Sequence, residues 1–588
     1  MSSPPQERVF HGVPTAPGVA IGEVFLYRHD VPQFREFRIP PEGRERELAR
    51  FRQALQETKR QLTDLRDRLA VQAGETAARI FDAQLLILED VEMLGRIESG
   101  INKSGVNAEV LVSRVTEEYR DKLAKLEGSF FHQRAQDVVD IGLRIVKNLL
   151  GLSDASIGPI DRPHILVADD LLPSDVIHLM RENVVAVATD LGGAASHTAI
   201  LTKSLEVPAV VGLKEVSRLV KTGDQIIVNG NSGKVIIHPS PETIPEYEAK
   251  REKYQLYVTS LEDIEKLPAE TLDGVRITLN ANIELPNEAK SAIAKGSDGI
   301  GLFRSEYLLL ARRRLPNEQE QYEDYRRVIE LSAPRPVTIR TFDVGGDKMF
   351  PELPTPAESN PVLGWRAIRV CLDHPQLFRT QLRAILRAAV HGSAKIMFPL
   401  ISGLDELHEL LEHFNAVKDD LRGERIRFDD KIKIGIMVEL PSAVLQAGRM
   451  AKEVDFFSIG TNDLTQFTLA VDRGNERVRD RYKPLHPSVV QLIAKTVLAG
   501  HKAGIKVALC GELAASPVAT MLLVGLGLDE LSVSPVALPE IKKLIRSMTF
   551  ADAKAFANKA QKIQSAREME AFCSKSMKKR FANLPIWF

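Results

Sequence analysis

Residues 184–201 read VVAVATDLGGAASHTAIL, and the rest of the chain is organised around them. The apolar run from Val184 predicts a short strand, the two glycines predict a tight turn, and the apolar residues after His197 predict the start of a helix. Such a turn lets backbone N–H groups approach an anion, Ser196 is a good N-cap, and the first turn of a helix favours negative charge. Neutral imidazole is also a competent nucleophile near pH 7. A lone histidine is more often a packing or surface residue, so the remaining sequence has to support His197 as a phosphoryl acceptor.

Further short strands on both sides of this stretch predict a small α/β unit. Apolar runs recur at 164–168, 209–211 and 225–230. A helical pattern covers 173–182, and two more β-type runs within residues 9–28 have no sheet of their own. We expect these early strands to join the later ones, which gives one discontinuous α/β domain formed by residues 1–30 and 152–237.

The intervening segment, residues 31–151, has the periodicity of helices. Apolar side chains recur at intervals of three, four and seven residues at Leu48, Phe51, Leu55, Leu62, Leu65 and Leu69. Similar patterns cover 76–98, 107–126 and 130–150. This segment therefore predicts a bundle of about four helices inserted into the α/β domain.

The C-terminal part, residues 272–588, alternates between strand-like and helix-like patterns. Eight candidate strands lie at 275–283, 299–304, 336–343, 395–400, 432–439, 455–460, 506–511 and 530–534. Eight strands with helical connections predict a (β/α)₈ barrel of the TIM type. The charged helical stretch 238–271 separates this barrel from the first part and is interpreted as a linker and hinge.

The composition excludes several classes of protein. The 588 residues contain 78 Lys plus Arg and 79 Asp plus Glu, which gives no general argument for nucleic acid or an anionic membrane as partner. Cys371, Cys510 and Cys573 are far apart, which argues against a disulfide framework and indicates a reducing environment. No leader pattern is present and no apolar run approaches the ~18 residues that span a bilayer. We expect a soluble cytoplasmic protein with no membrane insertion.

Charged and polar side chains gather where a barrel places its active site, at the carboxyl ends of the strands. The residues at or just beyond these ends are Arg304, Arg340, Glu439, Asn462, Asp463, Arg473 and Cys510. The forked donors of arginine suit a dense polyanion, and carboxylate oxygens suit Mg²⁺. Each residue alone would more often form a surface salt bridge, and Cys510 alone would more often be a small buried hydrophobe. Together they predict a pocket for phosphate and metal, with Cys510 as a candidate proton donor.

Two motifs resemble a known family. Residues 192–200 look like the phosphohistidine motif, and DFFSIGTNDLTQ at 455–466 looks like the phosphoenolpyruvate-binding motif, of enzyme I of the bacterial phosphotransferase system. The blocks NPVLGWR at 360–366 and RAQDVVDIG at 134–142 also resemble parts of this family. The resemblance covers nearly the whole chain.

This resemblance implies an enzyme that moves the phosphoryl group of phosphoenolpyruvate to its own His197 and then to the small carrier HPr, releasing pyruvate. It implies that Arg304, Arg340, Arg473 and Asn462 hold phosphoenolpyruvate, that Arg366 assists, that Glu439 and Asp463 bind Mg²⁺, and that Cys510 donates the proton. It further implies a swivelling phosphohistidine domain, a helical bundle that binds HPr, and a barrel that forms a homodimer.

Two alternatives stay open at this level. A dikinase or phosphoenolpyruvate synthase shares the histidine domain and the barrel, but it would need an additional nucleotide-binding domain, and no P-loop pattern occurs here. A scaffold without catalytic activity would also fold this way. One departure from the resemblance is Ala195, where many members of the family have threonine.

Overall fold

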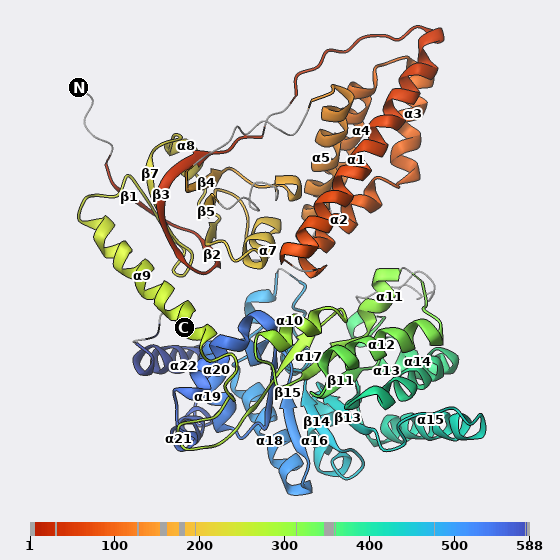
Figure 1. Ribbon diagram of the computed structural model, residues 1–588, viewed down its shortest axis with the longest axis vertical. Coiled ribbons are helices and arrows are strands. Elements are labelled where there is room, and N and C mark those ends of the chain that lie inside the picture. The colour runs from red at the N-terminus through yellow and green to blue at the C-terminus, as the bar shows by residue number, and fades with distance from the viewer. Residues whose placement is uncertain are drawn as a thin grey trace. The chain divides into compact units, whose positions relative to one another are not determined.

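The structure is a computed structural model that describes residues 6–29, 32–73, 75–125, 129–152, 162–175, 183–193, 196–312, 314–345, 358, 360–475, 477–582 and 584. It divides into two compact units, Met1–Leu256 and Tyr257–Phe588. Both units are drawn in Figure 1, and each is described here by itself.

The first unit contains a sheet of eight strands, in the order β1-β8-β7-β3-β4-β5-β6-β2. The strands are β1 (Arg8–His11), β2 (Val13–Ala16), β3 (Val19–Leu26), β4 (His164–Ala168), β5 (Val184–Thr189), β6 (Ala209–Val211), β7 (Gln225–Asn229) and β8 (Lys234–Ile237). The central strands β3 to β6 are parallel, and the outer pairs are antiparallel. The early strands thus lie in the same sheet as the later ones.

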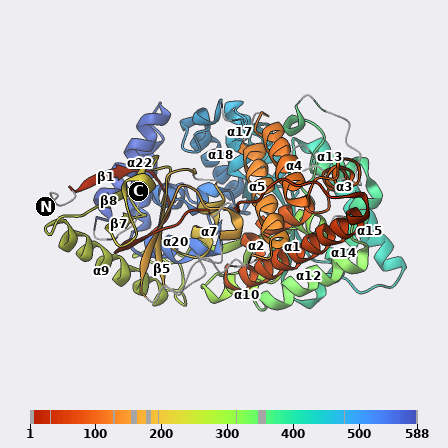
Figure 2. The same cartoon turned by 90° about the horizontal axis from the view of Figure 1, so that it is seen from above.

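Among the described residues, five α-helices lie between β3 and β4 along the chain. They are α1 (Arg44–Ala73), α2 (Glu75–Ile87), α3 (Val91–Ser104), α4 (Ala108–Ala124) and α5 (Ser129–Leu149). Figure 2 shows α1, α2, α4 and α5 grouped side by side. Fully buried Phe51, Leu62, Leu69 and Phe81 form part of their core. The predicted fold class, an α/β domain with an inserted helical bundle, is confirmed for this unit.

One helix prediction in the bundle is wrong. The pattern over 76–98 predicted a single helix, but α2 ends at Ile87 and α3 begins at Val91. Asp90 has an extended backbone, and its carboxylate accepts a hydrogen bond of 2.6 Å from the N–H of Met93. This N-cap begins a new helix, although the apolar spacing continues through the break.

Some predictions fall outside the described residues. Of the helix predicted at 173–182, only the short 3₁₀ turn Pro173–Asp175 is described. Ala195 lies among the residues that are not described. The first unit also contains α7 (His197–Ser204), α8 (Val216–Leu219) and most of α9 (Thr243–Glu262). The helix predicted in the linker is present as α9, and it ends at Glu262 rather than near Pro268.

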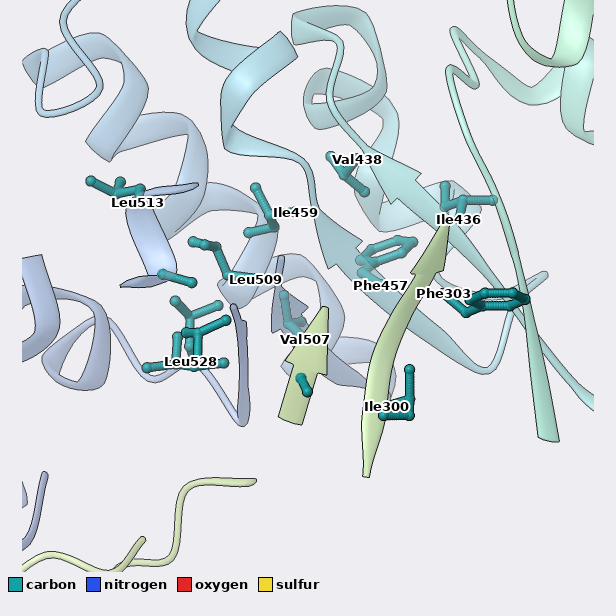
Figure 3. Close-up of a cluster of buried hydrophobic side chains, with 14 of the residues drawn as sticks. Ile300, Phe303, Ile436, Val438, Phe457, Ile459, Val507, Leu509, Leu513 and Leu528 are labelled. Carbon is teal, nitrogen blue, oxygen red and sulfur yellow. The ribbon is translucent and has the colours of Figure 1, made fainter. Parts of the chain in front are cut away.

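The second unit is a closed barrel of eight parallel strands, in the order β9 to β16. The strands are β9 (Thr278–Ile283), β10 (Ile300–Arg304), β11 (Val337–Arg340), β12 (Ala394–Phe398), β13 (Lys433–Val438), β14 (Phe456–Ile459), β15 (Lys506–Leu509) and β16 (Glu530–Val533). All eight predicted strands are present, most of them shorter than predicted. Figure 3 shows part of the apolar packing, with Ile300, Phe303, Ile436 and Phe457 buried.

Helices surround the barrel. They are α10 (Glu288–Ala294), α11 (Glu306–Arg312), α12 (Glu318–Ser332), α13 (Ile368–Asp373), α14 (Pro375–Ala388), α15 (Leu404–Gly423), α16 (Pro441–Met450), α17 (Thr461–Leu469), α18 (Pro487–Ala503), α19 (Pro517–Gly525), α20 (Leu538–Arg546), α21 (Phe550–Ala560) and α22 (Ala566–Arg580). The predicted (β/α)₈ barrel is therefore confirmed. Among the helices of the described residues, none combines the length and the apolar character that a bilayer crossing needs.

A buried lysine ties the segment after α9 to the barrel. Lys542 on α20 is only 2% exposed, and its Nζ donates hydrogen bonds to the carbonyl oxygens of Glu265 at 2.6 Å and Gly296 at 2.7 Å. Gly296 has a φ of +80°, and a Cβ there would lie 1.7 Å from the Glu265 carbonyl oxygen. Only glycine fits this close approach, so the chain at Glu265 is held against the barrel.

Candidate active site

His197 is the first residue of α7 and follows the double-glycine turn. Gly192 has a φ of +104°, which glycine adopts without strain. Ser196 is the N-cap, and its hydroxyl oxygen accepts a hydrogen bond of 3.3 Å from the N–H of Ala199. The strand, turn and helix predicted around this stretch are all present, and His197 itself is only 7% exposed.

The His197 imidazole lies beside a carboxylate of the helical bundle. Its Nε2 is 3.9 Å from Oδ1 of Asp137 on α5, and its Nδ1 has no hydrogen-bond partner among the described residues. Burial lowers the pKa of His197 to about 4, and burial raises the pKa of Asp137 to about 7. The imidazole is therefore neutral at pH 7 and retains a lone pair.

Asp137 was not assigned a role from the sequence. It lies in the block 134–142, and Arg134, one turn earlier on the same helix, donates from Nη1 to Asp137 Oδ2 at 3.0 Å. The i, i+3 spacing of arginine and aspartate was visible in the sequence. The proximity of Asp137 to His197 could not be seen in the sequence, because the two residues are 60 positions apart.

The second unit has a cavity of about 150 Å³ at the carboxyl ends of the barrel strands. It is lined by Leu302, Arg304, Tyr307, Arg340, Asp343, Arg366, Met437, Glu439, Gly460, Asn462, Asp463, Arg473, Cys510 and Gly511. All the site residues predicted from the barrel half of the sequence therefore share one cavity. His197 belongs to the other unit.

Two arginines of this cavity are buried and paired with carboxylates. Arg340 ends β11 and contacts Glu306 and, at 3.2 Å, Asp343. Arg366 donates two hydrogen bonds to Asp343, from Nε at 2.8 Å and from Nη2 at 3.1 Å. Both guanidinium groups are less than 10% exposed. Paired carboxylates hold these cations in place and offset much of the cost of burying them.

The other two arginines are more accessible. Arg304 ends β10, and its Nη1 is 3.3 Å from Glu284 Oε1, with the side chain 31% exposed. Arg473 follows α17 and makes no ion pair with the described residues. Asn462 donates to Glu512 at 3.1 Å and accepts from the Glu512 N–H at 2.9 Å, which joins the start of α17 to the segment after β15.

Glu439 and Asp463 are the two acidic residues predicted to bind a metal. Glu439 Oε1 accepts a hydrogen bond of 2.7 Å from the N–H of Leu400. Burial, together with the negative charges of Asp463 and Asp343, raises the pKa of Glu439 to about 8. Asp463 Oδ1 is buried and has no hydrogen-bond partner among the described residues. Repelling carboxylates and an unsatisfied buried oxygen fit a hard divalent cation, although the described residues contain no cluster of three or more potential metal ligands.

Cys510 lies at the end of β15, and its side chain faces the same cavity. Ser458 Oγ donates a hydrogen bond of 3.1 Å to its sulfur. Burial raises the pKa of the Cys510 thiol to about 11. The group therefore remains a protonated thiol at pH 7, as a proton donor requires.

Besides the glycines Gly460 and Gly511, four lining residues were not predicted from the sequence. Leu302 and Met437 form an apolar wall that includes Cys510, and Tyr307 lies beside Arg304. Asp343 lies three residues after Arg340, which was predicted as a site residue. The signal in the sequence was a carboxylate, Asp343, three residues after an arginine at the end of a strand.

Three sequence families match successive parts of the chain. The N-terminal region of PEP-utilising enzymes matches residues 11–134, their mobile domain matches 160–233, and their PEP-binding domain matches 258–550. The second match contains His197, and the third contains every predicted residue of the barrel cavity.

Relatives extend the similarity to almost the full length. The phosphoenolpyruvate-protein phosphotransferase of Haemophilus influenzae is 42% identical over 559 residues, which is 95% of this chain and 97% of the relative. The protein of the same name from Geobacillus stearothermophilus is 39% identical over 571 residues, 97% of this chain and 98% of the relative. A solution structure of Enzyme I (nEIt) shares 37% identity and covers 42% of this chain and 99% of its own, with a TM-score of 0.36.

Proposed function

Because the chain belongs to the phosphoenolpyruvate-protein phosphotransferase family, we propose that its barrel cavity binds phosphoenolpyruvate and that His197 accepts the phosphoryl group. Transfer of a phosphoryl group from phosphoenolpyruvate to a protein is the activity of this family, so the chain is a transferase. The dikinase alternative is disfavoured, because relatives matched over 97% of their own length are phosphotransferases.

One observation carries the assignment of the cavity. Four arginines, Arg304, Arg340, Arg366 and Arg473, share a cavity of about 150 Å³ with three acidic residues and a protonated thiol. Phosphoenolpyruvate carries a phosphate and a carboxylate on three carbons, so it needs several cations in a small volume. Phosphoryl transfer depends chiefly on positioning and charge neutralisation, and arginine forks supply both.

The acceptor role of His197 is supported by its protonation state. Its pKa of about 4 keeps the imidazole neutral, so a ring nitrogen can attack the phosphorus. The new N–P bond forms as the bond from phosphorus to the enol oxygen breaks. His197 and the cavity belong to different units, so we place the required hinge in the linker 238–271, where the boundary between the units falls within α9.

The enolate that remains must receive a proton on its methylene carbon to become pyruvate. Cys510 holds its proton at pH 7 and lies in the apolar part of the cavity with Leu302 and Met437. Proton transfer from the thiol gives pyruvate and a thiolate, which water then reprotonates. Protonation removes the enolate from the equilibrium and therefore favours phosphorylation of His197.

Magnesium is the cofactor that the family implies. Glu439 and Asp463 would hold the ion, since their oxygens are the hard ligands in the cavity and one of them is unsatisfied. When bound, Mg²⁺ neutralises charge on the phosphoryl oxygens.

The remaining assignments follow the family. The carrier that takes the phosphoryl group from His197 is HPr, and the bundle of residues 31–151 is its docking surface. The barrel of residues 272–588 forms the homodimer contact, and the protein acts in the cytoplasm. The α/β domain of residues 1–30 and 152–237 carries the phosphohistidine.

Labelling with ³²P-phosphoenolpyruvate and Mg²⁺, followed by peptide mapping, tests this proposal. The label should appear on the peptide that contains His197 and disappear in His197→Ala. His164→Ala is the matched control, because His164 is also buried and lies on β4 in the sheet of the same unit. It should label normally. Undiminished labelling of His197→Ala would refute the acceptor assignment.

A further inference from the structure

Asp343 joins the two buried arginines of the cavity. It lies three residues beyond the end of β11, is 2% exposed, and sits between Arg340, 3.2 Å from its Oδ2, and Arg366, which donates to both of its oxygens. The two-point contact with Arg366 fixes the plane of that guanidinium group as well as its position.

The contact continues to the acidic side of the cavity. The same Nη2 of Arg366 that donates to Asp343 also donates to Asp463 Oδ2, at 3.2 Å. Asp463 therefore has one oxygen satisfied by Arg366, while Oδ1 is buried without a partner among the described residues. A continuous chain of charges runs from Arg340 through Asp343 and Arg366 to Asp463.

The backbone around Asp343 is itself fixed. The N–H of Phe342 donates to Gln381 Oε1 at 3.0 Å, and the N–H of Ala367 donates to the Val344 carbonyl at 2.8 Å. The second bond joins the segment of Arg366 directly to the segment of Asp343. Neither carboxylate nor guanidinium can move without breaking a buried hydrogen bond.

Removal of the Asp343 charge has a specific consequence. Arg366 would then keep its hydrogen bond to Asp463, and its fork suits both oxygens of one carboxylate. Such a pairing would occupy Asp463 Oδ1. We propose that Asp343 is a positioning residue that holds Arg340 and Arg366 toward the phosphoryl group and keeps one oxygen of Asp463 open for the metal ion. This inference rests on the proposed roles of the cavity.

The test compares Asp343→Asn with a matched control. Glu318 on α12 likewise bridges two arginines, Arg383 at 2.7 Å and Arg387, but it does not line the cavity. The first readout is binding of Mn²⁺ to the full-length protein without substrate, followed by electron paramagnetic resonance. Asp343→Asn should weaken Mn²⁺ binding by about tenfold or more, as loss of a partner behind a metal ligand does. Glu318→Gln should leave it unchanged.

The second readout separates KM from kcat. Asp343→Asn should raise the KM for phosphoenolpyruvate by about tenfold and lower kcat less, because Cys510 and His197 are untouched. The double variant Asp343→Asn, Arg366→Gln should bind Mn²⁺ no more weakly than Asp343→Asn alone, since Asp343 acts through Arg366.

Three results would overturn the inference. One is wild-type Mn²⁺ affinity and KM in Asp343→Asn, and another is an equal loss in Glu318→Gln. If Asp343→Asn does not fold, Asp343→Ser replaces it, and failure of both to fold would assign Asp343 to barrel stability instead. Failure of the proposed function is distinguishable, because it would appear as absent His197 labelling in the wild-type protein, whatever the variants do.

Discussion

The surroundings of His197 and the barrel cavity show two opposite effects of burial. His197 has one carboxylate at 3.9 Å, and burial lowers its pKa to about 4, so it is uncharged. Arg340 and Arg366 are at least as deeply buried, yet Glu306, Asp343 and Asp463 keep them charged. A nucleophile needs a free lone pair, whereas a site for a polyanion needs permanent cations. The imidazole stays neutral because it is buried with little opposite charge nearby. The arginines stay charged because carboxylates surround them.

This contrast predicts that the cavity tolerates the loss of one charge poorly. Arg340→Met should lower kcat/KM by about a thousandfold, because it removes a cation from the phosphoryl site. It should also destabilise the barrel by about 3–5 kcal/mol, since Glu306 and Asp343 lose a buried partner. Steady-state kinetics and urea unfolding measure the two effects. Arg387→Met, outside the cavity, should keep its kcat/KM, and equal losses in both variants would contradict the contrast.

Cys510 tests whether the uncharged part of the cavity has its own role. Cys510→Ala should lower the rate of pyruvate formation by about a hundredfold, as loss of a general acid does. A coupled assay for pyruvate measures this rate. Cys371 is an equally buried thiol that does not line the cavity, so Cys371→Ala should react at the wild-type rate. Unchanged kinetics in Cys510→Ala would remove the thiol from the mechanism.

The pKa values of His197 and Asp137 predict two opposite pH dependences of stability, which nearly cancel in the wild-type protein. The lowered pKa of His197 makes its contribution to stability fall as the pH drops from 6.5 to 4. The raised pKa of Asp137, about 7, makes its contribution fall as the pH rises from 4 to 7. Each contribution is on the order of 3 kcal/mol, so the two nearly cancel.

Single variants should reveal these slopes. As the pH rises from 4.5 to 6.5, the free energy of unfolding of His197→Gln should decrease. Over the same rise in pH, the free energy of unfolding of Asp137→Asn should increase. Hydrogen exchange of α5 and α7 in the full-length protein, corrected for the intrinsic pH dependence of exchange, measures the local opening free energy. Slopes of the same sign in both variants would show that burial does not set these two pKa values.

The smallest effect concerns the hydrogen bond from Ser458 to Cys510. This bond lowers the pKa of the thiol against the larger effect of burial. Ser458→Ala should therefore raise the pKa of Cys510 and move the alkaline limb of the pH–rate profile to higher pH. The loss of one hydrogen bond should change kcat by about fivefold. A shift of the limb to lower pH would contradict the assignment.

Much of the fold could be predicted because its signals are local. The barrel strands are short apolar runs, and the rule that active sites lie at the carboxyl ends of barrel strands correctly predicts that Arg304, Arg340, Glu439 and Asp463 share one cavity. The break between α2 and α3 was missed because the apolar period continues across Asp90, even though a good N-cap residue was present.

The partners of the site residues could not be predicted in the same way. Asp137 and Asp343 matter through contacts with residues far along the chain, His197 and Arg366, and no local pattern states which carboxylate meets which cation. Protonation states could not be predicted from the sequence either, because the pKa of His197 depends on how completely the surrounding structure buries its side chain.

The clamp formed by Lys542 has a mechanical consequence. A pull transmitted along α9 reaches Glu265, where one hydrogen bond from Lys542 on α20 and the close approach of Gly296 hold the chain. An expression fragment that begins before Glu265 would retain this anchor, whereas one that begins at residue 272 would leave the Lys542 ammonium without one of its two acceptors.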